Sequence, residues 1–231
     1  MDFLDLEKKI GFNISNLKLL ETAFIHRSYL NENKMTPSHN ERLEFLGDAV
    51  LELIVTEYLY LNYENPEGDL TNWRSALVKR DTLAIVAREL NLGQYIQLSK
   101  GEELSGGREK DYILANTVEA MIGALYLDLG YEVVKSFLDK YLLVKLKNIL
   151  ENGLHIDAKS NFQEESQSIV GITPDYRLIK EVGPDHDKTF TVGLYLNDEL
   201  ISKGVGSSKQ TAEQDAADHG LKKKKWGKYK K

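Results

Sequence analysis

Residues 39–50 read HNERLEFLGDAV, and this stretch sets three carboxylates into a leucine-rich run. At 100° per residue in an α-helix, its acidic side chains fall within an arc of about 80° and the apolar ones lie roughly opposite. The acidic side holds Glu41, Glu44, Asp48 and Glu52, and the apolar side holds Leu43, Leu46, Val50 and Leu53. The pattern predicts an amphipathic helix, and taken alone it favours an ordinary surface helix over a metal site.

Two residues do not fit a plain surface helix. Phe45 lies on the acidic side, which indicates that this side is partly covered. Gly47 lies in the middle of the helix, where glycine costs about 1 kcal/mol relative to alanine. We therefore expect another segment to pack close to the backbone at Gly47.

The composition limits the classes to which the chain can belong. Its 231 residues, 42% of them hydrophobic, suffice for one large or two small domains. The absence of cysteine excludes disulfides, thiolate metal sites and cysteine nucleophiles, and fits a reducing compartment. The N-terminal residues MDFLDLEKKIGF lack the features of a signal peptide, and the longest apolar stretch, 120–127, is far shorter than the roughly 20 residues that span a bilayer. We expect a soluble cytoplasmic protein without a membrane segment.

Charge is distributed unevenly along the chain. The net charge of −6 argues at first against a nucleic-acid partner, since proteins that bind polyanions are usually basic. Residues 157–231, however, hold 13 Lys and Arg against 12 Asp and Glu, so the net charge is +1 there and −7 in the first 156 residues. The last ten residues, KKKKWGKYKK, contain seven lysines. Such a run is typical of a solvated tail; the alternative is a phosphate contact with Trp226 and Tyr229 available for stacking.

The periodicity of the apolar residues changes near residue 155. Up to about Leu150 the spacing is helical almost throughout. Beyond it the pattern predicts a helix at 159–170, strands at 175–182, 188–197 and 199–206, and a helix at 208–223. In the second strand one face holds Phe190, Val192, Leu194 and Leu196. We expect a mainly α protein with an all-α domain at 1–150, a linker at 151–156, a small α+β domain of order α-β-β-β-α at 157–223 and a basic tail at 224–231.

A further acidic residue, Glu119, lies in the segment ILANTVEAMIGALYL at 113–127. This segment is apolar on almost every side, so its helix is predicted to be buried. A buried carboxylate has to be protonated, paired with a basic residue or bound to a cation. A structural ion pair therefore stays open as one explanation of Glu119.

The sharper hypothesis is a metal site between two helices. Asn116, one turn before Glu119, adds a neutral oxygen ligand, and the two would face Glu44 and Asp48 across a helix pair. All-oxygen clusters select Mg²⁺ or Mn²⁺ rather than zinc. Such ions support phosphodiester hydrolysis without a histidine base, and the five histidines show no metal-ligand spacing. The sequence contains neither a G-x-S-x-G elbow nor a phosphate-binding loop ending in Gly-Lys-Ser/Thr.

Several segments, taken in order, resemble one known family. NERLEFLGDAVL at 40–51 closely resembles the signature of bacterial ribonuclease III. The family's other blocks resemble HRSYLNE at 26–32, GDLTNWRSALVKRDTLA at 68–84, GEELSGG at 101–107 and ILANTVEAMIGALYLD at 113–128. The C-terminal domain resembles the family's double-stranded RNA-binding domain, most specifically in GPDHDKTFTV at 183–192.

The resemblance implies an enzyme that cleaves double-stranded RNA with Mg²⁺, for which Mn²⁺ can substitute. It implies a homodimer in which each protomer cuts one strand. The products would carry 5′-phosphate and 3′-hydroxyl ends with short 3′ overhangs. Precursors of ribosomal RNA, messenger RNA and other structured RNAs would be the substrates.

By the same resemblance, Asp48 and Glu119 are the essential catalytic residues. The implied metal ligands are Glu44, Asp48, Asn116 and Glu119. Glu41 and Glu67 would lie at the edge of the cleft and touch RNA or support the site, and Phe45 would lie in the dimer interface.

Asn116 departs from the family pattern, because most members carry Asp at this position. An amide oxygen can still bind Mg²⁺ but brings no charge, so we expect weaker metal binding and a higher Mg²⁺ requirement. The alternative is a double-stranded RNA-binding or ribosome-assembly protein whose cleavage is weak or lost. The presence of all four carboxylates, Glu41, Glu44, Asp48 and Glu119, favours the enzyme.

In the C-terminal domain the resemblance implies three RNA-binding surfaces, which recognise the shape of the duplex. The first helix would contact one minor groove through Ser160, Gln163 and Glu164. His186 would reach the next minor groove. The start of the last helix would bind phosphate through Ser207, Ser208 and Lys209. Many such domains have two consecutive lysines there, whereas Gln210 follows Lys209 here.

Overall fold

The computed structural model describes residues 3–36, 38–153, 157–184 and 188–229. It divides into two compact units, Met1–His155 and Ile156–Lys231. Within the described ranges, none of the helices combines the length and the apolar character that a membrane crossing requires.

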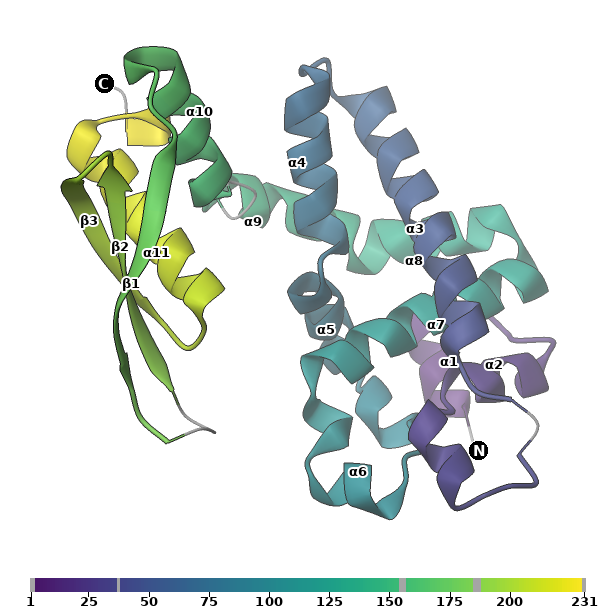
Figure 1. Ribbon diagram of the computed structural model, residues 1–231. Helices are drawn as coiled ribbons and strands as arrows, with labels where there is room; N and C mark the ends of the chain where they lie inside the picture. The colour runs from purple at the N-terminus through teal and green to yellow at the C-terminus, as the bar shows by residue number, and fades with distance from the viewer. Residues whose placement is uncertain (1–2, 37, 154–156, 185–187, 230–231) are drawn as a thin grey trace. The chain divides into compact units, whose positions relative to one another are not determined.

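The first unit is built from helices (Figure 1). They are α1 (Leu4–Ile10), α2 (Leu17–Ala23), α3 (Glu41–Asn62), α4 (Glu67–Val78), α5 (Arg80–Glu89), α6 (Lys100–Leu104), α7 (Asp111–Leu129), α8 (Tyr131–Tyr141) and α9 (Leu146–Glu151). Short 3₁₀ turns join them at η1 (Arg27–Asn31), η2 (Leu92–Tyr95), η3 (Gly107–Glu109) and η4 (Leu143–Lys145). Helix α7 lies between α3 and α5, and its side chains from 113 to 125 are buried except at two positions. The all-α prediction for this unit is confirmed.

Helices α3 and α7 touch backbone to backbone where they cross. A Cβ placed on Gly47 of α3 would lie 1.7 Å from the carbonyl oxygen of Glu119 in α7. Reciprocally, a Cβ on Gly123 of α7 would lie 2.3 Å from the carbonyl oxygen of Leu43 in α3. Glycine is therefore required at both positions of the contact. The prediction that a segment packs close to the backbone at Gly47 is confirmed.

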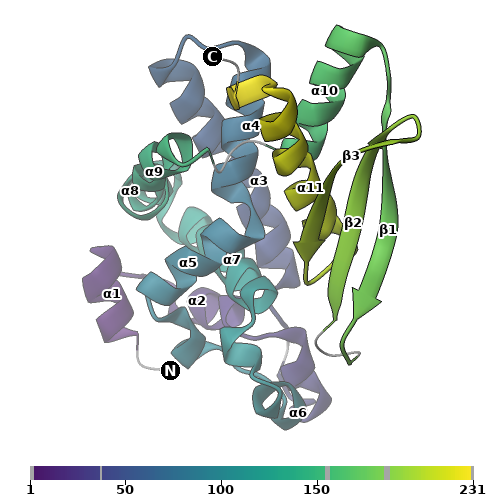
Figure 2. The same cartoon turned by 90° about the vertical axis from the view of Figure 1, so that its left-hand side faces the viewer.

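The second unit has the predicted order of one helix, three strands and one helix. Its elements are α10 (Ala158–Val170), β1 (Pro174–Val182), β2 (Thr189–Leu196), β3 (Glu199–Gly206), α11 (Lys209–Lys224) and the 3₁₀ turn η5 (Gly227–Tyr229). The strands form an antiparallel sheet in the order β1-β2-β3, and both helices cover the same face of it (Figure 2). On that face Val192, Leu194 and Leu196 are buried, while Phe190 is only partly buried.

The alternative interpretation of the tail, in which Trp226 and Tyr229 are available for stacking, is wrong for Trp226, which is buried. Trp226 is 8% exposed, and its ring lies 5.2 Å from the ring of Phe162 in α10. The Tyr229 hydroxyl donates a hydrogen bond to the carboxylate of Asp218 in α11, at 2.9 Å. The basic tail was inferred from its charge, whereas its two aromatic side chains contribute to the core of the domain.

We expect replacement of Gly47 by alanine to destabilise the first unit by about 2 kcal/mol, as overpacking of a filled contact costs about 1–3 kcal/mol. The obstructing atoms belong to the backbone of Glu119, so they cannot move aside as a flexible side chain would. Urea unfolding followed by far-UV circular dichroism measures the change. Gly68→Ala in α4 is the control, because nothing lies within 4 Å of that Cβ position. Equal unfolding midpoints for the two variants would contradict the prediction.

Candidate active site

At the crossing of α3 and α7, each of four polar side chains interacts with at least one on the other helix. The negative charges of Asp48 and Glu44 act on Glu119, and the side-chain amide of Asn116 forms a hydrogen bond to the carboxylate of Glu44. Glu44 and Asp48 lie one turn apart on α3, as Asn116 and Glu119 nearly do on α7. The structure thus brings together the four groups that the sequence pointed to as metal ligands.

The carboxyl group of Glu119 is hard to ionise in this setting. Burial is the largest cause, and the charges of Asp48 and Glu44 add to it, so that the pKa of Glu119 rises to about 7. Burial and the charge of Glu41 likewise raise the pKa of Glu44, and the hydrogen bond from Asn116 partly opposes this rise. The cluster therefore concentrates negative charge that nothing in it neutralises.

Glu119 has no basic partner among the described residues, so the structural ion pair that the sequence left open finds no support in them. Asn116 and Glu119 are the two side chains of α7 between 113 and 125 that are partly exposed, and the neighbours on either side of each are buried. A helix that opens to solvent at only these two positions presents both polar groups at one place. This arrangement is typical of a site that receives a ligand.

The four side chains fit a hard divalent cation in their chemistry, because all their donors are oxygen atoms. In the described part of the chain no three Asp, Glu or His side chains are already gathered closely enough to hold an ion. Ligation would therefore require rotation of the side chains, which Glu44 and Glu119, with three rotatable bonds each, allow.

Glu41 lies at the rim of this cluster. Its carboxylate is 3.5 Å from Arg27 Nη1 and 3.8 Å from His39 Nδ1, and its charge reaches Glu44. Arg27 is exposed and supplies positive charge at the edge of an otherwise acidic site.

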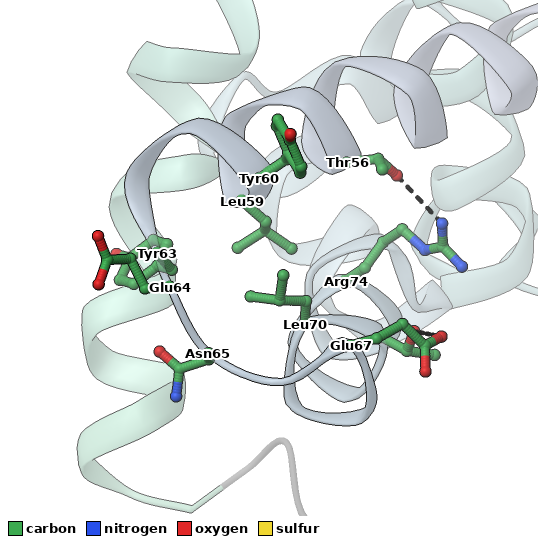
Figure 3. A pocket seen from close by; sticks show the side chains of 10 residues that line it. Thr56, Leu59, Tyr60, Tyr63, Glu64, Asn65, Glu67, Leu70 and Arg74 are labelled. Atoms are coloured by element: carbon green, nitrogen blue, oxygen red, sulfur yellow. Dashed lines mark hydrogen bonds between the residues drawn. The ribbon is translucent and has the colours of Figure 1, made fainter.

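Glu67 does not join the cluster within one chain. It opens α4, next to the end of α3 that is far from Glu44, and accepts a hydrogen bond from Thr71 at 3.1 Å. There it lines a groove of about 660 Å³ between α3 and α4, together with Tyr60, Leu70 and Arg74 (Figure 3). Any action of Glu67 on the cluster would have to come from another copy of the chain.

Phe45 is 81% exposed, so the described residues of this chain do not cover it. It begins a stripe of exposed residues along α3, at the spacing of one helix face. The stripe comprises Phe45, Ala49, Leu53, Thr56 and Tyr60.

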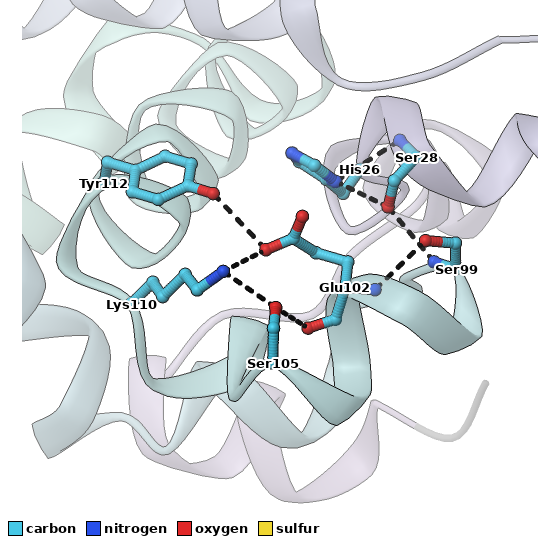
Figure 4. Close-up of polar contacts among 7 residues, drawn as sticks. All are labelled: His26, Ser28, Ser99, Glu102, Ser105, Lys110 and Tyr112. Carbon is cyan, nitrogen blue, oxygen red and sulfur yellow. Dashed lines mark hydrogen bonds and ion pairs between the residues drawn. The ribbon is translucent and has the colours of Figure 1, made fainter. Parts of the chain in front are cut away.

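A polar network before α7 was not found from the sequence (Figure 4). Lys110, which precedes α7 directly, donates to Glu102 at 2.6 Å and to Ser105 at 2.8 Å. Ser28 accepts a hydrogen bond from the Ser99 backbone N–H at 3.1 Å and so joins η1 to this network. These contacts fix the start of the helix that carries Asn116 and Glu119. The segments HRSYLNE and GEELSGG, noted for their resemblance alone, supply most of its members.

His26 connects this network to the rim of the cluster. The Ser28 backbone N–H donates to His26 Nδ1 at 3.3 Å, which leaves the Nε2–H of a neutral ring as a donor. Burial lowers the pKa of His26, although the charges of Glu102 and Glu41 oppose this. A neutral imidazole is therefore expected at pH 7.

In the second unit, Ser160, Gln163 and Glu164 are exposed on one side of α10. Ser207, Ser208 and Lys209 are exposed at the start of α11, where the Ser208 hydroxyl accepts a hydrogen bond from the Thr211 backbone N–H at 3.1 Å. His186 lies outside the described residues. The two exposed surfaces come from different elements, as the sequence led us to expect.

Comparison with known proteins covers both units. A model for ribonuclease-III-like domains matches residues 16–146, and a model of the double-stranded RNA binding motif matches residues 158–224. Ribonuclease 3 of Borreliella burgdorferi is 46% identical over 216 residues, which are 93% of this chain and 88% of that protein. Ribonuclease 3 of Enterococcus faecalis is 47% identical over 220 residues, which are 94% of this chain and 95% of that protein.

Among solved structures, the nuclease domain of ribonuclease III from Campylobacter jejuni superposes with a TM-score of 0.57 at 40% identity. The match covers 61% of this chain and 95% of that domain. Its description refers to structural flexibility in a region involved in dimer formation.

Proposed function

The chain belongs to the ribonuclease III family and is a ribonuclease that acts on double-stranded RNA, and from this premise we propose how its residues do so. The nuclease domain occupies 1–150 and the RNA-binding domain 157–223, with a linker at 151–156 and a basic tail at 224–231. We assign the activity to the cytoplasm, for which the absence of cysteine is the supporting observation. The expected substrates are precursors of ribosomal RNA and other structured RNAs.

The interaction of Glu44, Asp48, Asn116 and Glu119 is the observation that carries the proposed chemistry. These four side chains would hold Mg²⁺, or Mn²⁺ in its place, with Asp48 and Glu119 as the essential catalytic residues. The bound ion would supply an activated water and neutralise charge on the phosphate oxygens. The products would have 5′-phosphate and 3′-hydroxyl ends with short 3′ overhangs.

The protein's own residues orient the cluster and limit its protonation. The pKa of Glu44 is raised by its burial and by the charge of Glu41, and the hydrogen bond from Asn116 limits this rise, which favours the ionised form that binds a cation. Burial of Glu119 excludes part of the solvent from the cluster, and this strengthens its interaction with any positive charge. Arg27 at the rim offers a positive contact for the RNA backbone.

The second domain would hold the duplex while the first one cuts it. A-form RNA presents a wide and shallow minor groove lined by 2′-hydroxyl groups. The exposed polar side of α10, with Ser160, Gln163 and Glu164, fits that groove, and His186 would reach the next one. The start of α11 would bind phosphate through the exposed N–H groups of a helix N-terminus and through Ser207, Ser208 and Lys209.

We further propose a homodimer formed along the exposed stripe of α3. Two α3 helices that pack antiparallel about a two-fold axis near Leu53 would place Phe45 of one protomer opposite Tyr60 of the other. The groove beside Tyr60 would then receive the exposed Phe45 ring. This arrangement would also bring the partner's Glu67 toward Glu41, where both would edge one RNA-binding cleft.

Incubation with long duplex RNA tests the enzymatic activity directly. We expect cleavage with Mg²⁺ and none with EDTA, and Glu119→Gln should lower the rate with Mg²⁺ by about 100-fold or more, since it removes a charged ligand of the proposed ion. Gel analysis of the fragments and of their end groups reads out the reaction. Intact RNA in the presence of Mg²⁺ would instead favour the alternative, an RNA-binding or ribosome-assembly protein with weak or lost cleavage.

We expect Asn116→Asp to lower the Mg²⁺ concentration that gives half-maximal cleavage, by about tenfold, because it adds a negative charge to the ligand set. Mn²⁺ binding to the same variants, followed by electron paramagnetic resonance without RNA, separates metal affinity from catalysis. Asn116→Ala serves as a comparison, because it removes the oxygen donor without adding charge. If Asn116→Asp leaves the Mg²⁺ concentration for half-maximal cleavage unchanged, Asn116 does not weaken metal binding and the prediction is wrong.

Replacement of Phe45 by aspartate is expected to convert the dimer into a monomer at micromolar concentration, since it places a charge in an apolar contact. Analytical ultracentrifugation measures the mass, and circular dichroism verifies the helix content. Leu104→Asp is the matched control, because Leu104 is 88% exposed on α6, away from the α3 stripe. A dimer that survives Phe45→Asp would rule out this interface.

A further inference from the structure

The lysine-rich end of the chain is folded back onto its own domain as far as the structure describes it, to Tyr229. We call residues 222–229 the lysine segment. Helix α11 ends in a Schellman motif, in which the Trp226 N–H donates to the Leu221 carbonyl at 2.9 Å and the Lys225 N–H donates to the Lys222 carbonyl at 3.3 Å. Lys225 takes the left-handed conformation that this motif requires, with φ of 57°. The chain therefore reverses direction after α11.

Three contacts hold the reversed chain in place. The Trp226 ring packs on Phe162 of α10, and the Tyr229 hydroxyl donates to Asp218 of α11. Gly227 has φ of 56°, and a Cβ on it would lie 2.8 Å from the Asn161 side-chain oxygen. The turn between the two aromatic residues is thus seated directly on α10.

The part of α10 on which this turn packs borders the surface that we propose for RNA binding. Asn161 follows Ser160 in the chain and precedes Gln163 and Glu164, which are exposed. Asn161 itself is partly buried, because the turn lies beside it. The backbone of the turn is therefore held at the flank of the α10 surface.

The charge of the domain depends on this segment. Residues 157–221 contain six Lys and Arg against twelve Asp and Glu, a net charge of −6, and residues 222–231 add seven positive charges, five of them in the lysine segment. Without it the RNA-binding domain would repel the phosphate backbone at long range. At the start of α11, moreover, Lys209 is followed by Gln210.

Two of the lysines are engaged within the domain. Lys223 donates to the Ile201 carbonyl at 2.8 Å, and Lys224 lies 3.8 Å from Glu199. Lys222 and Lys225, by contrast, are exposed and have no ion-pair partner among the residues that the structure describes. These two side chains are available for an external anion.

We propose that the lysine segment is an additional RNA-binding surface that contacts the phosphate backbone of the duplex beside the groove occupied by α10. Trp226 and Tyr229 anchor the segment to the domain and do not stack on bases. This inference rests on the binding of double-stranded RNA by the second domain. The lysines neutralise phosphate charge at one place on the duplex, because the anchored turn fixes where they contact it.

Binding of the full chain to a fluorescein-labelled duplex RNA of about 20 base pairs tests the proposal, as such a duplex exceeds the roughly 16 base pairs that one domain spans. Fluorescence anisotropy in EDTA, without cleavage, gives the affinity at several NaCl concentrations. The test variant is Lys222→Gln with Lys225→Gln, the two exposed lysines without an ion-pair partner among the described residues. The matched control is Lys180→Gln with Lys203→Gln, which removes two exposed lysines from β1 and β3.

We expect the test variant to bind about 5- to 20-fold more weakly at 100 mM NaCl and the control to change by less than about twofold. The slope of log affinity against log salt concentration should become shallower by about 1 to 2 for the test variant alone, because each lost phosphate contact removes about 0.7 to 0.9. Equal effects of the two variants would overturn the proposal while leaving RNA binding by the domain intact. If the unmodified chain fails to bind the duplex, both that binding and the inference fall.

A second variant tests the anchor without a change of charge. Tyr229→Phe removes the hydroxyl that donates to Asp218 and keeps all seven lysines. We expect an affinity about 2- to 4-fold weaker with the domain still folded at the temperature of the binding assay, since the lysines are then held less firmly. An affinity equal to that of the unmodified chain would contradict the anchoring role of Tyr229.

Discussion

The close crossing of α3 and α7 at Gly47 and Gly123 is the constraint on which the active site depends. A Cβ on either glycine would collide with the backbone of the other helix. At this separation, carboxylates on α3 and α7 sense each other's charge across the crossing: burial raises the pKa of Glu119 most, and the charges of Asp48 and Glu44 add to the rise, to about 7. A wider crossing with larger residues would leave the same side chains on two separate helix surfaces. The two glycines therefore allow the carboxylates of the two helices to interact, although neither has a side chain that could take part in the reaction.

The site stores unfavourable electrostatic energy, because Glu44, Asp48 and Glu119 repel one another and no basic residue of the described chain pairs with Glu119. The surrounding structure has to oppose that repulsion. Buried side chains on both sides of Glu119 hold α7 in place, and the Lys110 network with Glu102 and Ser105 holds its first turn. Asn116 reduces the repulsion by placing a neutral donor against Glu44. Compared with a carboxylate, the amide at this position lowers the negative charge of the cluster and supplies a hydrogen bond that orients Glu44.

Periodicity was enough to predict the helical first domain and the three strands of the second, because each follows from which face of an element is buried. The close approach at Gly47 was predicted from the cost of a glycine in the middle of a helix. Family resemblance was needed to assign roles to Asp48 and Glu119. Other features depend on contacts between distant segments and had no local signal. Glu67 lies far along α3 from Glu44, and Ser28 joins Ser99 across the chain. The burial of Trp226 was not predicted for a related reason. A lysine-rich composition indicates a solvated tail, but the left-handed conformation of Lys225 turns the chain back, so that Trp226 packs on Phe162.

The distribution of charge raises a question of how an acidic chain binds an acidic polymer. The first 156 residues carry −7 and residues 157–221 carry −6, so most of the protein repels RNA. Such repulsion is screened within about 8 Å at physiological salt, which means that binding is decided by the groups in direct contact with the phosphates. The last ten residues carry seven positive charges, and two exposed lysines among them, Lys222 and Lys225, lie next to the turn that Trp226 and Tyr229 fix. Lysines held in direct contact with the phosphates outweigh a larger number of scattered negative charges. The acidic nuclease domain can then keep the carboxylates that its metal chemistry needs, since affinity for the duplex is supplied by a different part of the chain.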